Sequence, residues 1–251
     1  MLSALVCTLV LAWQVFADTP VAVAANRDEA VDRPSLPPER IDGDPAVVAP
    51  RDEEAGGTWI GYNEHDVFVA ITNRWIEADL AGERSRGLLV RDALEHESAE
   101  DAARHVEQAV REHEYDGFNL AIADAKGAVL LEWDGQLAVR NLEPGVHVVV
   151  NVGADGDYVI PSYRPEVGEQ QAGNANAVRT ALRPEPGEQA GEWLDRAKDV
   201  VSDHEYGVCI HRDGFGTRSS SLLSIGEEGA SYRFAAGPPC ETEYRRVESQ
   251  F

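Results

Sequence analysis

The most constraining feature of the chain lies near its start, where two apolar runs follow each other closely. Residues 7–14 and residues 21–25 are rich in Val, Leu and Ala, with only a short interval between them. Runs of this length and composition are typical of β-strands. If the two strands are neighbours, Cys7 at the start of the first lies beside the polar run Asn26-Arg27-Asp28-Glu29 that follows the second. A cysteine is therefore expected next to a group of polar side chains at the end of a buried strand pair.

Strand-like runs dominate the rest of the chain as well. They are short, often β-branched and bounded by Gly, Asp or Pro, and they cover residues 58–62, 67–72, 118–123, 128–133, 137–141, 147–151, 208–211, 218–225 and 231–235. Two pairs of amphipathic helices are expected at residues 86–96, 98–110, 175–182 and 192–202. The acidic, proline-rich stretch 32–52 is expected to be a long loop, either a solvated insertion or a lid over a site. This pattern predicts an α+β fold, a four-layer αββα sandwich of two antiparallel sheets with helices on each outer face.

The charge of the chain limits its partners. Asp and Glu total 45 against 22 Lys and Arg, which gives a formal net charge of −23, and only Lys126 and Lys198 are lysines. Carboxylates in this excess repel phosphate backbones and anionic membranes, so neither nucleic-acid binding nor stable membrane insertion is expected. The composition is typical of a protein from a halophile, and an ordinary acidic protein is the alternative.

The three cysteines, Cys7, Cys209 and Cys240, stand at unrelated spacings without a C-x-x-C pair. This pattern predicts neither a disulfide framework nor a zinc site, so no metal is expected, and it favours a reducing, cytoplasmic compartment. Residues 2–17 are apolar enough to suggest an export signal, but no basic residue precedes them and Gln14 interrupts them. A buried strand that carries Cys7 is the preferred interpretation.

Further motifs give the chain a family resemblance. The run Asn26-Arg27-Asp28-Glu29 is followed by Gly56-Gly57-Thr58-Trp59 and by Val69-Ala70-Ile71-Thr72-Asn73. With these motifs, residues 7–233 resemble the NRDE family, also called the Transport and Golgi Organisation 2 family. The resemblance implies a single domain over residues 7–240 with the fold of the N-terminal-nucleophile hydrolases.

The same resemblance implies that Cys7 is a nucleophile. At the start of a mature chain its free α-amine, which titrates near about pH 8, could take the thiol proton, and no catalytic histidine would be required. Residues 1–6 are accordingly interpreted as a mis-assigned start, with translation beginning at the Val6 codon, or as a removed leader. The alternative is that Cys7 is an inert cysteine in a buried strand.

Similarity to the choloylglycine-type cysteine hydrolases implies roles for further residues. Asp28 would hold the α-amine, Asn73 would donate an N–H to the oxyanion, and Asn151 would be a second asparagine of the pocket. Arg218, in a Gly-Thr-Arg segment, would bind a substrate carboxylate or support the thiolate. For each of these residues, a turn or a surface ion pair is the structural alternative.

The predicted substrate-binding residues are Asn26, Arg27 and Trp59. In the choloylglycine-type enzymes the turn reads Arg-Asn-x-Asp, and alignment with it puts Ala25 where those enzymes have their arginine. Arg27 is adjacent, but successive residues of a strand point to opposite faces, so it would substitute only if the turn re-aims it.

These residues favour a cytoplasmic hydrolase of linear amide or acyl bonds that acts on a small-molecule substrate and needs no cofactor. The main alternative also comes from the family, whose eukaryotic members are linked to Golgi organisation, lipid metabolism and haem trafficking. In that case the pocket carries haem or another hydrophobic, lipid-like ligand without chemistry. A catalytically inactive scaffold is the third interpretation.

The charge generates a prediction about salt. Raising potassium chloride from low to molar concentration is expected to raise the thermal midpoint, because salt screens the self-repulsion of a chain with a formal charge of −23. Thermal melts across a potassium chloride series measure this. A midpoint that stays flat or falls would contradict the halophile interpretation.

Overall fold

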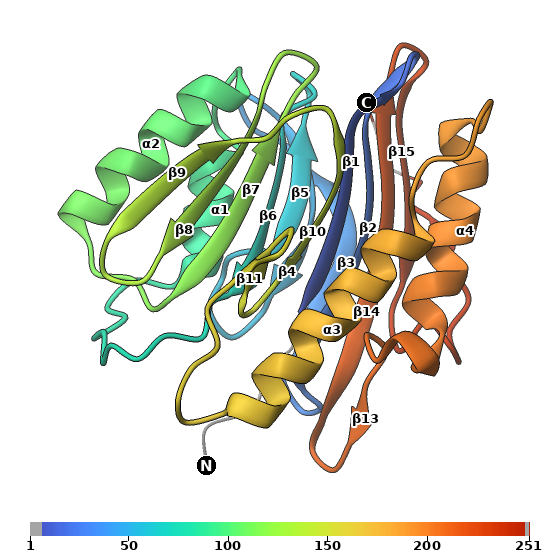
Figure 1. Cartoon of the computed structure of the whole chain (residues 1–251). Coiled ribbons are helices and arrows are strands. Elements are labelled where there is room, and N and C mark those ends of the chain that lie inside the picture. Colours follow the sequence, from blue (N-terminus) through green and yellow to red (C-terminus); the bar gives the residue numbers. More distant parts are fainter. Residues whose placement is uncertain (1–6, 249–250) are drawn as a thin grey trace. The chain divides into compact units, whose positions relative to one another are not determined.

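The computed structural model describes residues 7–248 and residue 251, and these fall into two compact units. Of the described residues, unit 1 holds 7–33 together with Pro144–Val247, and unit 2 holds Pro34–Glu143 with residues 248 and 251. The described residues form two antiparallel sheets and four α-helices, one sheet and one helix pair in each unit (Figure 1). The predicted α+β class is confirmed, and each unit supplies one sheet with its helical cover.

The sheet of unit 1 carries the start of the chain near its centre. Its order is β12-β11-β10-β1-β2-β14-β15-β16, with β13 paired to β14. The strands are β1 (Thr8–Phe16), β2 (Thr19–Ala30), β10 (Gly145–Val150), β11 (Gly153–Ala154), β12 (Asp157–Tyr158), β13 (His211–Arg212), β14 (Phe215–Gly226), β15 (Gly229–Ala235) and β16 (Arg245–Arg246). Helices α3 (Pro165–Ala181) and α4 (Ala190–Ser202) lie along one face of this sheet, where α3 contacts β10 and α4 contacts β2 (Figure 1). None of the described helices is long and apolar enough to cross a membrane.

The sheet of unit 2 runs in the order β3-β4-β5-β6-β7-β8-β9. Its strands are β3 (Ser35–Ile41), β4 (Val47–Asp52), β5 (Ile60–Asn63), β6 (Phe68–Asn73), β7 (Phe118–Ala123), β8 (Ala128–Trp133) and β9 (Leu137–Asn141). Helix α1 (Arg86–Ala93) packs on β6, and α2 (Ala99–Glu112) packs on β7 and β8. The predicted apolar stripe of α2 is buried, and its small side chains let the helix lie close to the sheet.

The strand pair at the start of the chain forms as expected. In the antiparallel pair β1–β2, Thr8 lies opposite Asn26, so Cys7 comes directly before the paired residues and beside the polar run. The other edge of β1 pairs with β10, and β2 pairs with β14. The apolar residues 9–12 and 21–24 of these two strands are all buried, which fixes the register because a shift by one residue would turn every side chain to the other face.

Three expectations about elements were wrong. Residues 32–52 are not a long loop, since they contain β3 and β4. The prolines of β3 are tolerated because β3 is an edge strand. On its outer side there is no neighbouring strand that would need the missing N–H donors. The helix expected at residues 175–182 begins ten residues earlier, at Pro165, and the strand expected at 208–211 is reduced to the short β13.

The motif Gly56-Gly57-Thr58-Trp59 marks a close contact between two backbones of unit 2. A Cβ atom at Gly57 would lie 2.1 Å from the carbonyl carbon of Gly87, in the first turn of α1. The N–H of Thr58 donates to the Gly87 carbonyl at 3.0 Å. Only glycine allows the helix start to approach the strand entry this closely.

Gly57→Ala is therefore expected to lower the free energy of unfolding by about 1–3 kcal/mol, because the added methyl group forces the two backbones apart. Gly173→Ala is the matched control. Gly173 is exposed in the middle of α3 with open space around its Cα, so alanine there should stabilise by about 0.5–1 kcal/mol through its helix propensity. Urea denaturation of both variants measures the difference, and a Gly57→Ala chain as stable as the wild type would contradict the contact.

Candidate functional site

Cys7 stands immediately before β1, between the ends of its two neighbours β2 and β10. Its main-chain N–H donates to Oδ1 of Asn151 at 3.0 Å. Its sulfur lies 3.8 Å from the main-chain carbonyl oxygen of Asp28. The structure therefore brings together three of the predicted catalytic residues, all of them in unit 1.

The side chain of Asn151 is held in place by its burial and by two hydrogen bonds. It follows β10, is fully buried, and its Oδ1 accepts a second hydrogen bond from Nε2 of Gln171 at 2.8 Å. Gln171 was missed by the sequence analysis. It lies on the buried stripe of α3 with Ala175 and Val178, so a polar residue in an apolar helical stripe was the available signal. Asn151 thus holds the Cys7 nitrogen, a role that the resemblance gave to Asp28.

Asp28 is buried in β2, and its carboxyl group is tied to the opposite strand. The hydroxyl of Thr217 in β14 donates to Oδ1 of Asp28 at 2.5 Å and accepts from the N–H of Ile210 at 2.9 Å. Oδ2 has no hydrogen-bond partner among the described residues. Burial raises the pKa of Asp28 well above its ordinary value, although the Thr217 hydrogen bond and the charges of Arg212 and Arg27 oppose the shift. The neutral acid is the form that this environment favours.

Arg27 follows Asn26 in β2, the residue that pairs with Thr8 of β1. The guanidinium is almost fully buried and lies 3.8 Å from the carboxylate of Glu29. Its charge favours the Cys7 thiolate. The predicted role of Arg27 in substrate binding stays a prediction.

The thiol of Cys7 is nevertheless neutral in the chain described. Burial is the largest cause and the nearby Asp28 the second, and together they raise the pKa of Cys7 to about 12, which the Arg27 charge only partly offsets. A thiol with this pKa is a poor nucleophile near pH 7.

The remaining predicted residues have distinct surroundings. Asn26 donates through Nδ2 to the carbonyl oxygens of Val201 and Val208, at 2.9 and 2.8 Å, so its amide holds α4 and the following segment to the sheet. Arg218 is the extra residue of a β-bulge, because its neighbours in β14 pair with consecutive residues of β2. Asn73 ends β6 and Trp59 precedes β5, both partly buried in unit 2, so their roles at the Cys7 site stay predictions.

A cavity of about 580 Å³ opens beside the cysteine site in unit 1. Its wall combines residues of α3, including Gln171, with residues of the segment 204–212 and Glu241. Gln171 both lines the cavity and donates to Asn151, so one side chain separates the cavity from the residue that holds Cys7. A cavity of this volume accommodates a small organic molecule.

Comparison with known proteins assigns the chain to a family. The family model "Transport and Golgi organisation 2" matches residues 6–235. The chain belongs to this family. The human Transport and Golgi organization protein 2 homolog is 26% identical over 234 residues, which cover 82% of each chain. The match begins next to Cys7 and spans both units, so the resemblance inferred from the sequence motifs is confirmed.

Solved structures similar to this family member are hydrolases. Penicillin V acylase from Agrobacterium tumefaciens has a TM-score of 0.56 and 16% identity, covering 92% of this chain and 83% of that one. The Caenorhabditis elegans ortholog of N-acylethanolamine-hydrolyzing acid amidase has a TM-score of 0.55 and 12% identity, covering 86% and 92%. These similarities establish the N-terminal-nucleophile hydrolase fold.

The free energy of unfolding of the wild-type chain is expected to fall as pH rises, and Asp28→Asn is expected to abolish the part of this fall that Asp28 causes. Because burial raises the pKa of Asp28, the folded chain keeps a proton over a pH range in which the unfolded chain has released it. The free energy of unfolding therefore falls with rising pH in that range, by up to about 1.4 kcal/mol per pH unit, and asparagine has no proton to keep. Urea denaturation at steps from about pH 4 to about pH 8 measures the slope.

Asp213→Asn is the matched control for this experiment. Asp213 is exposed in the turn between β13 and β14, so its loss should leave the wild-type slope in place. Equal slopes for Asp28→Asn and the wild type would mean that Asp28 is already ionised in the folded chain.

Proposed function

We propose that the protein hydrolyses linear amide or acyl bonds with Cys7 as an N-terminal nucleophile. The proposal is carried by the hydrogen bond from the main-chain nitrogen of Cys7 to the buried Oδ1 of Asn151. This bond fixes a nitrogen next to the thiol, in the position where a free α-amine acts as the base. No described histidine forms a hydrogen bond with Cys7 that could replace it.

The reaction would proceed in two steps. The α-amine takes the thiol proton, and Sγ of Cys7 attacks the substrate carbonyl; the carbon–sulfur bond forms, the bond to the leaving group breaks, and the ammonium returns the proton to the leaving group. Water then cleaves the thioester and regenerates the thiol. For an amide the products are a carboxylic acid and an amine. Asn73 keeps the oxyanion role that the resemblance implies, and Arg218 with Trp59 keeps a role in substrate binding.

Exposure of the α-amine would also change the charges of the site. An ammonium group at Cys7 adds a positive charge close to the thiol and to Asp28. Opposite charges a few ångström apart favour each other's ionised forms, so both the thiolate and the Asp28 carboxylate become more stable. Removal of residues 1–6 would thus convert a neutral, inactive site into an ionised, reactive one.

The named activities of the structural neighbours support this substrate class. One neighbour is a penicillin V acylase, and another is an ortholog of an N-acylethanolamine-hydrolyzing acid amidase. A shared fold does not fix a function, so the amide or acyl substrate is proposed from the fold and the site together. We place the protein in a reducing, cytoplasmic compartment, because a nucleophilic thiol stays reduced there. A small molecule is the proposed partner, in keeping with a surface that repels nucleic acid and anionic membranes.

A chain released from a cleavable fusion so that it begins at Cys7 is expected to hydrolyse members of a panel of fluorogenic acyl amides and thioesters. A chain that retains residues 1–6 should not, because its amine is blocked. In the processed form, Cys7→Ser should abolish turnover. Asn151→Ala should lower kcat by roughly a hundredfold and shift the pH–rate profile, because the base loses the acceptor that positions it. Asn141→Ala, at the exposed end of β9, is the matched control and should act like the wild type.

Alkylation with iodoacetamide gives a second readout that needs no substrate. An ammonium group beside the thiol lowers its pKa, so Cys7 should react faster near pH 7 in the processed chain than in the longer one. Cys209 and Cys240 in the same samples are internal references. Equal rates for Cys7 in both chains, together with no turnover across the panel, would contradict the hydrolase and leave carriage of haem or a lipid-like ligand as the explanation to pursue.

A further inference from the structure

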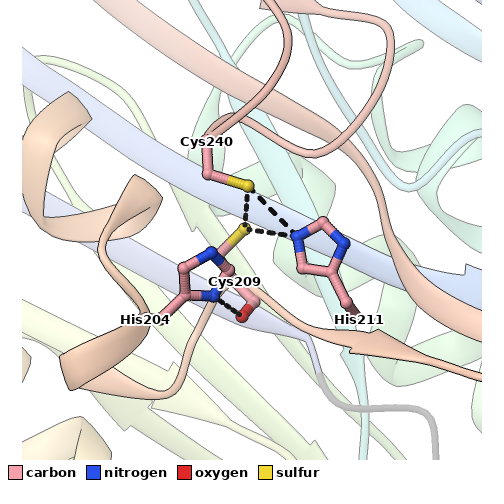
Figure 2. A group of neighbouring side chains, drawn as sticks. All are labelled: His204, Cys209, His211 and Cys240. Carbon is pink, nitrogen blue, oxygen red and sulfur yellow. Dashed lines mark hydrogen bonds between the residues drawn. The ribbon is translucent and has the colours of Figure 1, made fainter.

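A second group of reactive side chains lies in unit 1, away from the thiol of Cys7. We call it the Cys2His2 cluster, and it consists of His204, Cys209, His211 and Cys240. His204 belongs to a short 3-10 helix, η1 (His204–Tyr206), Cys209 and His211 belong to the segment that leads into β14, and Cys240 lies in the loop after β15. The four side chains point toward one another, although Cys240 is 29 residues beyond His211 in the sequence (Figure 2).

The spacing of the ligand atoms is that of a metal site. The two sulfur atoms are 3.5 Å apart, and Nε2 of His211 lies 3.1 Å from the Cys240 sulfur and 3.8 Å from the Cys209 sulfur. All four possible ligand atoms lie within 4.8 Å of one another. In a tetrahedral zinc site, bonds of about 2.3 Å to sulfur and about 2.0–2.1 Å to nitrogen put neighbouring ligand atoms roughly 3.3–3.8 Å apart. The cluster needs only small movements to reach that geometry.

We propose that the Cys2His2 cluster binds one zinc ion. Two thiolates and two imidazoles form a donor set that suits zinc in tetrahedral geometry and suits magnesium or calcium poorly. Both histidines are exposed, so an ion can reach the cluster, whereas Cys209 is buried and gives the site a fixed inner ligand. The cysteine spacings match no zinc motif, so no metal was expected from the sequence; the fold, however, brings two of the three cysteines into contact.

The hydrogen bonding of His204 supports the same assignment. Its Nδ1 lies 3.3 Å from the main-chain carbonyl oxygen of Cys209 (Figure 2). A proton on Nδ1 donates to that carbonyl and leaves the lone pair on Nε2. Metal-binding histidines are commonly oriented in this way, through a hydrogen bond from the ring nitrogen that does not bind the ion.

A disulfide between Cys209 and Cys240 is the competing interpretation. At 3.5 Å the sulfur atoms are separate thiols, since a disulfide bond measures about 2.05 Å. A disulfide would also give no role to the two imidazoles beside the sulfurs. A zinc ion engages all four side chains at once.

Four protein ligands leave no open position, so the ion would be structural rather than catalytic. It would join η1, the segment into β14 and the loop after β15. This segment includes Ile210, whose N–H donates to Thr217, the residue that holds Asp28. Zinc would therefore stiffen the support of the Cys7 site and one wall of the cavity beside it. Cys240 lies beyond residues 6–235, so the family match does not include the complete cluster.

The test is the zinc content of the full-length chain, purified under reducing conditions in molar potassium chloride to screen weak binding to surface carboxylates. We expect one zinc ion per chain by mass spectrometry of the metal. Cys240→Ser and His211→Ala should each lower the content about tenfold or more, and chelation should lower the thermal midpoint of the wild type. Cobalt substitution should give the intense visible bands of a tetrahedral cobalt thiolate, and these bands should be lost in both variants.

Two control variants isolate the cluster from the other thiol and from histidines in general. Cys7→Ser and His65→Ala, the latter exposed in unit 2, should each retain one zinc ion. A wild-type chain that contains no zinc and takes up none, zinc binding that survives Cys240→Ser and His211→Ala, or a Cys209–Cys240 disulfide in freshly reduced protein would each overturn the proposal. Because Cys7→Ser is catalytically dead under the proposed function yet should bind zinc, the two proposals fail independently.

Discussion

The site depends on one buried hydrogen bond, from the hydroxyl of Thr217 to the carboxyl group of Asp28. It joins the polar end of β2 to β14 at a point where Asp28 and Thr217 lie directly opposite each other. Through the N–H of Ile210 it also fixes the segment that leads into β14. Burial of this carboxyl group with a partner for only one of its oxygens has an energetic cost.

The ionisable groups around Cys7 include two buried acids, the Cys7 thiol and Asp28, and one nearby positive charge, Arg27. Burial raises the pKa of both Asp28 and Cys7, and the guanidinium of Arg27 lies beside the carboxylate of Glu29. One positive charge at the nitrogen that Asn151 holds would favour ionisation of both acids together. The free α-amine of the proposed mechanism would supply that charge.

Much of the fold could be predicted because strand and helix periodicity is local. The neighbouring strands β1 and β2 and the buried stripe of α2 follow from patterns of a few residues. Long-range pairing explains what was missed. The prolines of β3 argued against a strand, and they fit one only because β3 lies at the edge of its sheet. The hydrogen-bond partners of Asn151 and Asp28 lie on other elements, distant in sequence. The family motifs identified Cys7 and Asn151 by resemblance, whereas no local pattern indicates that Gln171 donates to one of them.

The same limit explains why the sequence did not indicate the Cys2His2 cluster. The cysteine spacings match no zinc motif, and Cys240, in the loop after β15, meets Cys209 only in the folded chain. The segment from Cys209 to Thr217 then serves two sites, because its first residue is a proposed zinc ligand and its last residue holds Asp28. Both residues of β13 are exposed, whereas Ile210 before it and Phe215 at the start of β14 are buried. The proposed zinc ion at one end of this segment and the buried Asp28 carboxyl group at the other would keep it rigid, as the proposed nucleophile requires.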